Sequence, residues 1–363
     1  MKKRIKTIFN NIETPPDALI IKNATQPFLD PSFFYITGIE HGIFEGSYAF
    51  AYPDGTLDLI IPELEAETAK HTTAHLHIYK TKDDVQQLLK KFTAPLHSVG
   101  VNSQAITQRD YQALQELCPH LTFRDISSAL IQTRLIKDTK ELDLITHACH
   151  ITDTVIHDIP SLITTGLREN ELAAEIDYRM QKNGAEKPAF TTISSFGKNT
   201  AEPHYSHGET TLKNGDFILC DFGACYHNYN ADVTRTFVHG KANTRQKDIY
   251  HTVLQAQTIG LDMIRPGISA SDVHHAVFSF IETTPWKGRF IHSTGHALGL
   301  SVHDGPGFTE DSPLTLKENM VLTVEPGIYI PGYGGVRIED DIVVTKNGYK
   351  LLTQSSKTLQ ELQ

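Results

Sequence analysis

Five residues in the second half of the sequence have side chains that together could bind metal ions. They are four carboxylates and one imidazole: Asp221, Asp232, His296, Glu325 and Glu339. Each lies in a short apolar stretch, where a buried anion is very unfavourable unless a cation neutralises it. Four carboxylates with one imidazole suit two hard-to-borderline divalent ions, and a paired metal site is a known means of activating water. These residue types therefore predict a metal-dependent hydrolase.

The two aspartates lie in neighbouring apolar segments that are predicted to be strands. Residues 216–223 contain Asp221, and residues 232–238 begin with Asp232. A turn at residues 227–230 would fold the two segments into an antiparallel pair and bring the carboxylates together. Either aspartate taken alone could equally cap an element or form a turn, so the prediction depends on the whole set of five.

The histidine and the first glutamate lie in a glycine-rich segment and at a strand end. His296 belongs to residues 292–300, whose glycines would let the backbone approach a site closely. Glu325 ends a strand that is predicted at residues 321–325, directly before a Pro-Gly turn. Either histidine of the glycine-rich segment taken alone would more often be structural.

The second glutamate lies inside an apolar run that is predicted to be one strand, residues 335–344. Because strand side chains alternate, Arg337, Glu339 and Asp341 are expected on one face. Salt bridges to Arg337 are the alternative explanation for the acids of this strand. The joint occurrence of all five ligands favours the metal site.

The elements around these residues predict an α/β chain with a duplicated core in its second half. In the first 125 residues, strands are expected at 18–21, 47–52, 57–61 and 98–102, and helices at 83–91 and 108–117. Helices are then expected at 140–157, from 166 to near 184, at 244–264 and at 269–283. Two helix pairs with two groups of strands predict a pseudo-duplicated α/β core, and residues 127–133 are the expected boundary before it.

Length and composition favour a soluble two-domain enzyme over several other classes. The chain has 363 residues and a net charge of −10, which argues against a general nucleic-acid binder. No apolar run approaches the roughly 20 residues that span a bilayer, so no membrane association is expected. The basic amino terminus lacks the apolar stretch of a signal peptide, and the four cysteines form no paired framework. A cytoplasmic location is therefore expected.

Five strings around the candidate ligands resemble the pita-bread metallopeptidases, the family of methionine aminopeptidase, aminopeptidase P and prolidase. In chain order the strings are LCDFG (219–223), ADVTRT (231–236), TGHALGL (294–300), TVEPGIY (323–329) and GVRIED (335–340). The resemblance extends over nearly all of residues 135–350, and no ligand position is substituted.

The resemblance implies a role for each ligand. Asp221 would chelate one metal ion, and Asp232 and Glu339 would bridge both ions. His296 and Glu325 would complete the coordination of the other ion. Two divalent ions are expected, with manganese preferred and cobalt, zinc or iron also compatible with this set of ligands.

The resemblance also implies catalytic residues beside the metals. Residues 195–204 look like the family segment that ends in a substrate-side histidine, here His204, and His303 would flank the metals from the other side. Both would hydrogen-bond to the scissile carbonyl and the developing oxyanion, with packing alone as the alternative. A metal-bridging hydroxide would attack the carbonyl carbon, Glu325 would take or relay the proton, and Arg337 would orient neighbouring carboxylates.

The amino-terminal part places the resemblance in the creatinase, prolidase and aminopeptidase P branch. Residues 1–128 would be a creatinase-like α/β domain and residues 134–363 the pita-bread catalytic domain. This branch includes enzymes that cut Xaa-Pro bonds, which lack the N–H that ordinary peptidases use. The expected activity is aminopeptidase P on peptides with proline second, in a homodimer. Prolidase is the alternative, and a non-catalytic peptide-binding module is a remote one.

Overall fold

The computed structural model describes residues 1–363 and divides them into two compact units, residues 1–134 and 135–363. The expected boundary, residues 127–133, is helical and belongs to α6 (Ser127–Leu135). The division of the chain into domains at 1–128 and 134–363 stays a prediction. None of the helices combines the length and the apolar composition that crossing a membrane would require.

The amino-terminal unit is built on one six-stranded sheet with the order β4-β3-β2-β1-β5-β6. Its strands are β1 (Ala18–Lys22), β2 (Tyr48–Ala51), β3 (Leu57–Pro62), β4 (His75–Tyr79), β5 (Ser98–Val101) and β6 (Thr122–Asp125). Its helices are α1 (Lys2–Asn10), α2 (Pro31–Thr37), α3 (Ala66–Ala69), α4 (Lys82–Thr93) and α5 (Gln108–Leu117), with the 3-10 turn η1 (Glu63–Glu65). The sheet is mixed, because β1 pairs antiparallel with β2 and parallel with β5.

The expected strands and helices of this unit are present, and six elements were missed. The missed elements are α1, α2, α3, η1, β4 and β6. Strand β4 carries two histidines and has no buried residue, so it lacks the apolar alternation by which strands are recognised. Helix α4 begins with a capping box between Thr81 and Asp84, which explains why its start could be placed from the sequence.

The carboxy-terminal unit contains the two expected helix pairs. They are α7 (Thr139–Asp158) with α8 (Glu169–Lys182), and α9 (Thr244–Met263) with α10 (Ala270–Glu282). Short 3-10 turns are η2 (Ile159–Ser161) and η3 (Gly197–Ala201). The long helices α7 and α9 each start with a capping box, formed by Asp138 with Glu141 and by Asn243 with Gln246. These local signals agree with the predicted helix starts.

Strands of this unit form four small sheets, ordered β18-β12-β9-β8, β13-β16-β17, β14-β15 and β11-β10-β7. Their bounds are β7 (Lys187–Pro188), β8 (Ile193–Phe196), β9 (Phe217–Phe222), β10 (Ala224–Tyr226), β11 (Tyr229–Asn230), β12 (Val233–His239), β13 (Val321–Val324), β14 (Gly327–Ile330), β15 (Gly334–Arg337), β16 (Asp340–Thr345), β17 (Gly348–Leu351) and β18 (Glu361–Leu362). Strands β9 and β12 pair antiparallel, as predicted, with Asp221 opposite Thr234.

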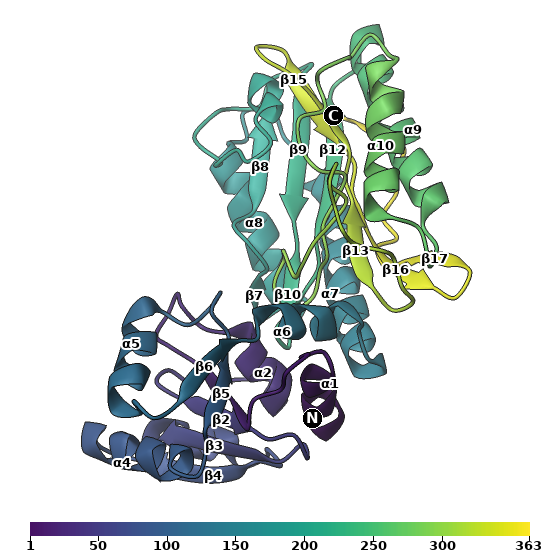
Figure 1. The fold of residues 1–363 in the computed structure, drawn as a ribbon. Helices are drawn as coiled ribbons and strands as arrows, with labels where there is room; N and C mark the ends of the chain where they lie inside the picture. The colour runs from purple at the N-terminus through teal and green to yellow at the C-terminus, as the bar shows by residue number, and fades with distance from the viewer. The chain divides into compact units, whose positions relative to one another are not determined.

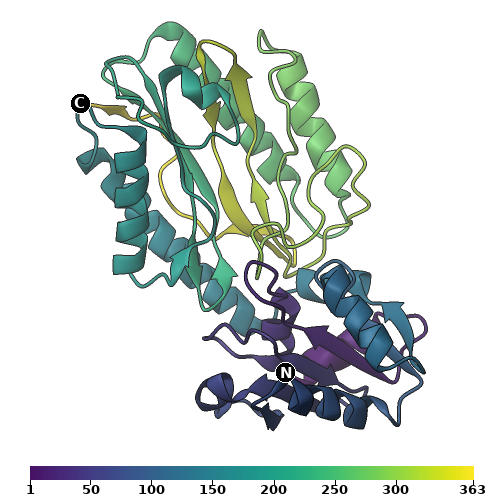
Figure 2. The same cartoon turned by 90° about the vertical axis from the view of Figure 1, so that its left-hand side faces the viewer.

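The strands of this unit lie between the two helix pairs. Figure 1 shows α8 beside β8, and α9 and α10 together on the other side of the strands. Figure 2 shows the same arrangement in the turned view, with teal helices on one side of the yellow strands and green helices on the other. One apolar cluster joins α7 and α8 to β9 and β12, and another joins α9 and α10 to β14 and β15. Two helix-covered layers therefore enclose the strands that carry the acids.

The predicted single strand at residues 335–344 is wrong, because the chain changes partner in its middle. Residues up to Arg337 form β15 and pair with β14, whereas residues from Asp340 form β16 and pair with β13. Between them, the Glu339 N–H donates to the Thr234 carbonyl of β12 over 3.2 Å. Because the ladder is interrupted there, simple alternation does not hold across residues 337–341.

Candidate metal centre

The five predicted ligands come from separate places in the carboxy-terminal unit and line one cavity of about 420 Å³. Asp221 lies near the end of β9, and Asp232 directly precedes β12. Glu325 follows β13, and Glu339 lies in the break between β15 and β16. His296 lies in the irregular segment between α10 and β13. The fold thus brings together side chains that span more than a hundred residues of sequence.

The ligand atoms are close enough for shared metal ions. Those of Asp232, His296 and Glu339 all lie within 4.8 Å of one another. His296 Nε2 is 3.5 Å from Asp232 Oδ2 and 3.4 Å from Glu325 Oε1. Since metal–ligand distances near 2 Å put ligand atoms of one ion roughly 3 Å apart, little movement is needed for coordination.

Electrostatics make this cluster of acids unfavourable without cations. Burial, with the neighbouring carboxylates, raises the pKa of Asp232 and of Glu339 well above their ordinary values. Burial also raises the pKa of Glu325. The buried oxygens Asp221 Oδ1 and Glu339 Oε1 have no hydrogen-bond partner. Unpartnered carboxylate oxygens that point into one cavity are what divalent ions would satisfy, so the residues fit a metal site.

Salt bridges to Arg337 do not explain the acids. Its guanidinium pairs with Asp221 and donates to Thr234 Oγ1 over 2.9 Å and to the Tyr329 hydroxyl over 2.8 Å. These contacts use all three guanidinium nitrogens and only one of the four carboxylates. One guanidinium cannot neutralise four buried anions, so the alternative explanation fails on charge alone.

A hydrogen-bonded chain that the sequence did not predict extends from Arg337 into the cavity wall. Tyr329 accepts from Arg337 and lies 2.9 Å from His292 Nε2, and His292 Nδ1 lies 2.7 Å from the Ser293 carbonyl. Because a carbonyl only accepts, Nδ1 carries the proton and Nε2 accepts from Tyr329. Burial, followed by the charge of Arg337, lowers the pKa of His292 to about 3, which keeps this imidazole neutral.

Asp341 supports the site without lining the cavity, contrary to its predicted place beside Arg337 and Glu339. Its Oδ2 accepts from the Asp232 N–H over 2.9 Å and from the Cys149 thiol over 3.3 Å. Burial raises the pKa of Asp341 to about 8. The interruption of the strand turns this carboxylate toward α7, where it holds the backbone of a ligand.

The two predicted substrate-side histidines both line the cavity and are exposed to solvent. His303 packs edge-on against His296, with 4.2 Å between ring centroids. Partial burial of the ring against the cavity wall and the neighbouring imidazoles of His296 and His204 lower the pKa of His303. A neutral imidazole there has one N–H to donate.

Two glycines let the backbone around His296 pack tightly. A Cβ on Gly307 would lie 2.1 Å from the Gly295 carbonyl oxygen and 2.4 Å from the His296 Cα. A Cβ on Gly295, where φ is 158°, would lie 2.0 Å from the Thr323 carbonyl oxygen. No side chain fits at either place, so these glycines fix the path of the segment that carries His296, the candidate imidazole ligand.

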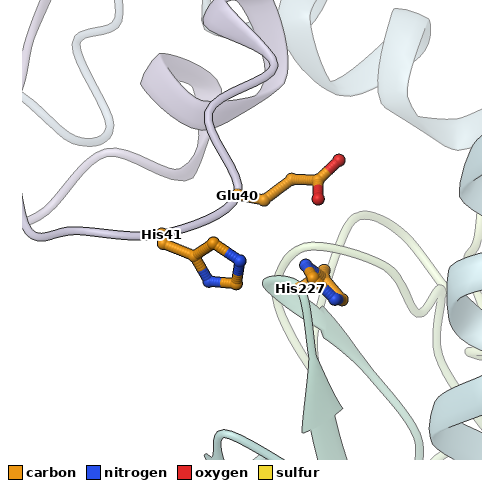
Figure 3. A group of neighbouring side chains, drawn as sticks. All are labelled: Glu40, His41 and His227. Atoms are coloured by element: carbon orange, nitrogen blue, oxygen red, sulfur yellow. The ribbon is translucent and has the colours of Figure 1, made fainter. Parts of the chain in front are cut away.

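A second group of possible ligands is drawn in Figure 3: Glu40, His41 and His227. Glu40 and His41 follow α2 in the amino-terminal unit, whereas His227 lies between β10 and β11 in the carboxy-terminal unit. Because they belong to different units, no common site is assigned to them.

Comparison with known families identifies both parts of the chain. Residues 143–346 match Metallopeptidase family M24, and residues 15–136 match the Creatinase/Prolidase N-terminal domain. The chain belongs to metallopeptidase family M24. This M24 chain is a metal-dependent peptidase, and the predicted fold, a creatinase-like α/β domain before a pita-bread domain, is confirmed.

Several known proteins are similar to this M24 chain over most of its length. An Xaa-Pro dipeptidase of Pyrococcus furiosus is 39% identical over 303 residues, which are 83% of this chain and 85% of that protein. The structure of the prolidase from Pyrococcus horikoshii OT3 matches with a TM-score of 0.88 and 35% identity, covering 100% of this chain and 99% of that one. The X-Pro aminopeptidase from Thermotoga maritima MSB8 matches with a TM-score of 0.89 and 30% identity, covering 95% and 97%.

Proposed function

We propose that this M24 peptidase is an Xaa-Pro dipeptidase, a prolidase. The convergence of five metal-ligand side chains on one cavity supports the hydrolytic reaction. Relatives that are named Xaa-Pro dipeptidase or prolidase support the substrate class. The cavity volume of about 420 Å³ is near the small end of the roughly 300–1,000 Å³ of small-molecule sites, which suits a dipeptide.

Asp221, Asp232, His296, Glu325 and Glu339 would hold two divalent ions. When bound, these ions would polarise the scissile carbonyl and make a water acidic enough to act as nucleophile near neutral pH. We expect manganese first, with cobalt, zinc or iron as alternatives, since oxygen ligands with one imidazole accept all four.

The side chains around the cavity supply positioning and proton transfer. Glu325 would take the proton of the attacking water, because its carboxylate lines the cavity beside the other candidate ligands. His303 and His204 would donate to the carbonyl oxygen as it gains charge. Arg337 would keep Asp221 oriented through their ion pair.

Aminopeptidase P is the second candidate, and it was the activity expected from the sequence. The similarity to the X-Pro aminopeptidase of Thermotoga maritima favours it. The two activities share the same bond and differ in whether residues may follow the proline. A peptide-binding module without catalysis is disfavoured, since every ligand position of the metal site is retained.

The test compares Ala-Pro with Ala-Pro-Ala after chelation and addition of Mn²⁺, with Ala-Ala as the control for proline dependence. A dipeptidase is expected to cleave Ala-Pro with a kcat/KM at least about tenfold above that for Ala-Pro-Ala, a difference of roughly 1.4 kcal/mol in transition-state binding. Preferential cleavage of Ala-Pro-Ala would make the enzyme an aminopeptidase P. No cleavage of either peptide with any of the four metals would refute both.

Two further expectations accompany this function. We propose a homodimer, which sedimentation at several protein concentrations would test. We also propose that the enzyme works in the cytoplasm, and cell fractionation with an antibody to the native chain would test that location.

A further inference from the structure

His204 lies on a segment with little regular structure of its own. It follows η3 (Gly197–Ala201), is exposed, and lines the metal-site cavity. A hydrogen-bond donor accelerates a reaction only if it is held in the productive place, and a shift of about 1 Å can cost roughly 100-fold in rate. The contacts that hold this segment therefore affect the rate of the reaction, because they set the position of His204.

Glu169, the first residue of α8, is 0% exposed and contacts this segment with both carboxylate oxygens. Oε1 accepts from the Phe196 N–H over 2.8 Å and from Asn199 Nδ2 over 2.9 Å. Oε2 accepts from the Tyr205 hydroxyl over 2.8 Å and from the Gly208 N–H over 3.2 Å. All four partners are donors, the pattern that an ionised carboxylate satisfies.

The four donors lie on both sides of His204 in the sequence. Phe196 and Asn199 precede it, Tyr205 follows it directly, and Gly208 comes three residues later. One buried carboxylate thus joins the two ends of the segment. Its place at the start of a helix adds the favourable field of the helix N-terminus.

Other contacts hold the parts of the segment on either side of His204 and Tyr205, including one between His207 Nδ1 and the Thr192 carbonyl at 2.9 Å. The Gly335 N–H donates to Thr200 Oγ1 over 2.7 Å, and the Asn170 N–H donates to the Gly208 carbonyl over 3.0 Å. Near His204 itself, the anchored side chain is that of Tyr205, whose hydroxyl contacts Glu169 and Asn199. Loss of the carboxylate would free the middle of the segment and leave its ends in place.

We propose that Glu169 is a positioning residue that fixes the segment presenting His204 to the scissile carbonyl. This inference rests on the proposed peptidase function, because His204 acts there as a donor to substrate. Glu169 touches neither substrate nor metal, and it acts only through the place of the imidazole.

The test is a double-mutant cycle between Glu169→Gln and His204→Ala, measured as kcat and KM for Ala-Pro. Glutamine keeps the shape, but one pair of donors then meets an NH₂ group in place of an oxygen. Alone, Glu169→Gln is expected to lower kcat about 10–100-fold with little change in KM. In the His204→Ala background, Glu169→Gln is expected to lower kcat less than about twofold, because the imidazole that Glu169 positions is absent.

Two controls separate positioning from general damage. Glu171→Gln alters an exposed glutamate in the same first turn, paired with Arg168, and should leave kcat unchanged. Hydrogen exchange of peptides covering residues 196–208 should speed up in Glu169→Gln, while bound metal stays at the wild-type stoichiometry. If Glu169→Gln does not fold, Tyr205→Phe, which removes one of the four donors, replaces it in the same cycle.

Equal losses of kcat from the Glu169 change in both backgrounds would overturn the proposal, as would unchanged exchange of residues 196–208. If the wild-type enzyme cleaves no Xaa-Pro peptide, the proposed function fails instead. The exchange experiment, which needs no substrate, then decides by itself whether Glu169 holds the segment.

Discussion

At the scale of single residues, Asp232 is a side chain that metal binding would require and that destabilises the folded protein when metal is absent. Its carboxylate lies among other buried acids, and burial with their charges raises its pKa well above the ordinary value. Asp232→Asn removes one anion from the cluster and one oxygen ligand from the proposed metal pair. We expect hydrolysis to be abolished and the metal content to fall.

The same change should stabilise the metal-free protein. Without metal, Asp232 must either stay charged beside other acids or take up a proton, and asparagine avoids both costs. A gain of about 1 kcal/mol would raise the thermal midpoint by roughly 2–4 °C in a unit of this size. Calorimetry in the presence of chelator measures this midpoint, and element analysis measures the metal. A lower midpoint for the metal-free variant, or near-normal turnover in excess Mn²⁺, would contradict the assignment.

His303 is predicted to contribute through a single hydrogen bond. Its lowered pKa leaves a neutral imidazole with one N–H, which would donate to the developing oxyanion. His303→Ala should reduce kcat by about 10²-fold or more, with metal binding intact. His251→Ala changes an exposed histidine on α9 and should leave kcat unchanged. Equal rates for the His303 variant and wild type would remove His303 from the reaction.

Residue types singled out five candidate ligands, which the fold brings to one cavity and whose metal binding stays a prediction, but they did not reveal the contacts that support these residues. An acid in an apolar stretch is a local anomaly, so each ligand could be recognised from its own neighbourhood. His292 and Tyr329 matter through a hydrogen bond between residues 37 positions apart, which no local pattern records. Cys149 likewise acquires its role only because α7 packs where Asp341 points.

At the scale of elements, the break between β15 and β16 is held by Arg235, a residue of β12 that is 1% exposed. Its guanidinium pairs with Asp340, donates to the Glu339 carbonyl, and donates to the carbonyls of Ser355 and Ser356. The apolar stretches around Asp221 and Asp232 predicted β9 and β12 correctly. It could not predict the break, since the break depends on a buried cation from a strand a hundred residues earlier.

Arg235→Lys should therefore lower the free energy of unfolding of the carboxy-terminal unit, although the net charge does not change. Lysine keeps the charge but lacks the planar guanidinium, whose several N–H groups donate to several carbonyls at once. The expected loss is about 3 kcal/mol, near the low end for breaking a buried pair, because Lys357 still pairs with Asp340 over 2.8 Å. Thermal midpoints measure the loss, with Arg265→Lys on an exposed face as the control. Equal midpoints for the two variants would refute a special role for Arg235.

At the scale of the whole molecule, the chain combines two units with separate cores, and the metal site lies entirely in the second. The sequence predicted both folds from resemblance and pattern. The preference between Ala-Pro and Ala-Pro-Ala is a different kind of property, because it depends on what limits the cavity beyond the reacting bond. No single residue string encodes that limit, which is why the sequence favoured aminopeptidase P and the relatives favour a dipeptidase.

The buried acids also predict how the stability of the metal-free protein depends on pH. Asp341 has a pKa of about 8 in the folded chain and an ordinary value near 4 when unfolded, and Asp232 and Glu339 are shifted in the same direction. Between these values the folded state binds more protons than the unfolded state, so stability falls as pH rises. The pKa of His292 is lowered to about 3, so this imidazole does not change the dependence of stability on pH above its ordinary pKa of about 6.5.

The fall in stability should therefore be clearest between pH 6.5 and pH 8. Chelated protein should lose about 1–2 kcal/mol of stability across this range through Asp341 alone, and its thermal midpoint should fall. Metal-loaded protein should not show this fall, because metal ions displace the protons and bind more tightly as pH rises. In the chelated protein, Asp341→Asn should make the free energy of unfolding fall less steeply with pH, by the amount that one carboxyl group contributes. A midpoint of the chelated wild type that stays level from pH 6.5 to 8 would show that these carboxyl groups are not protonated in the folded state.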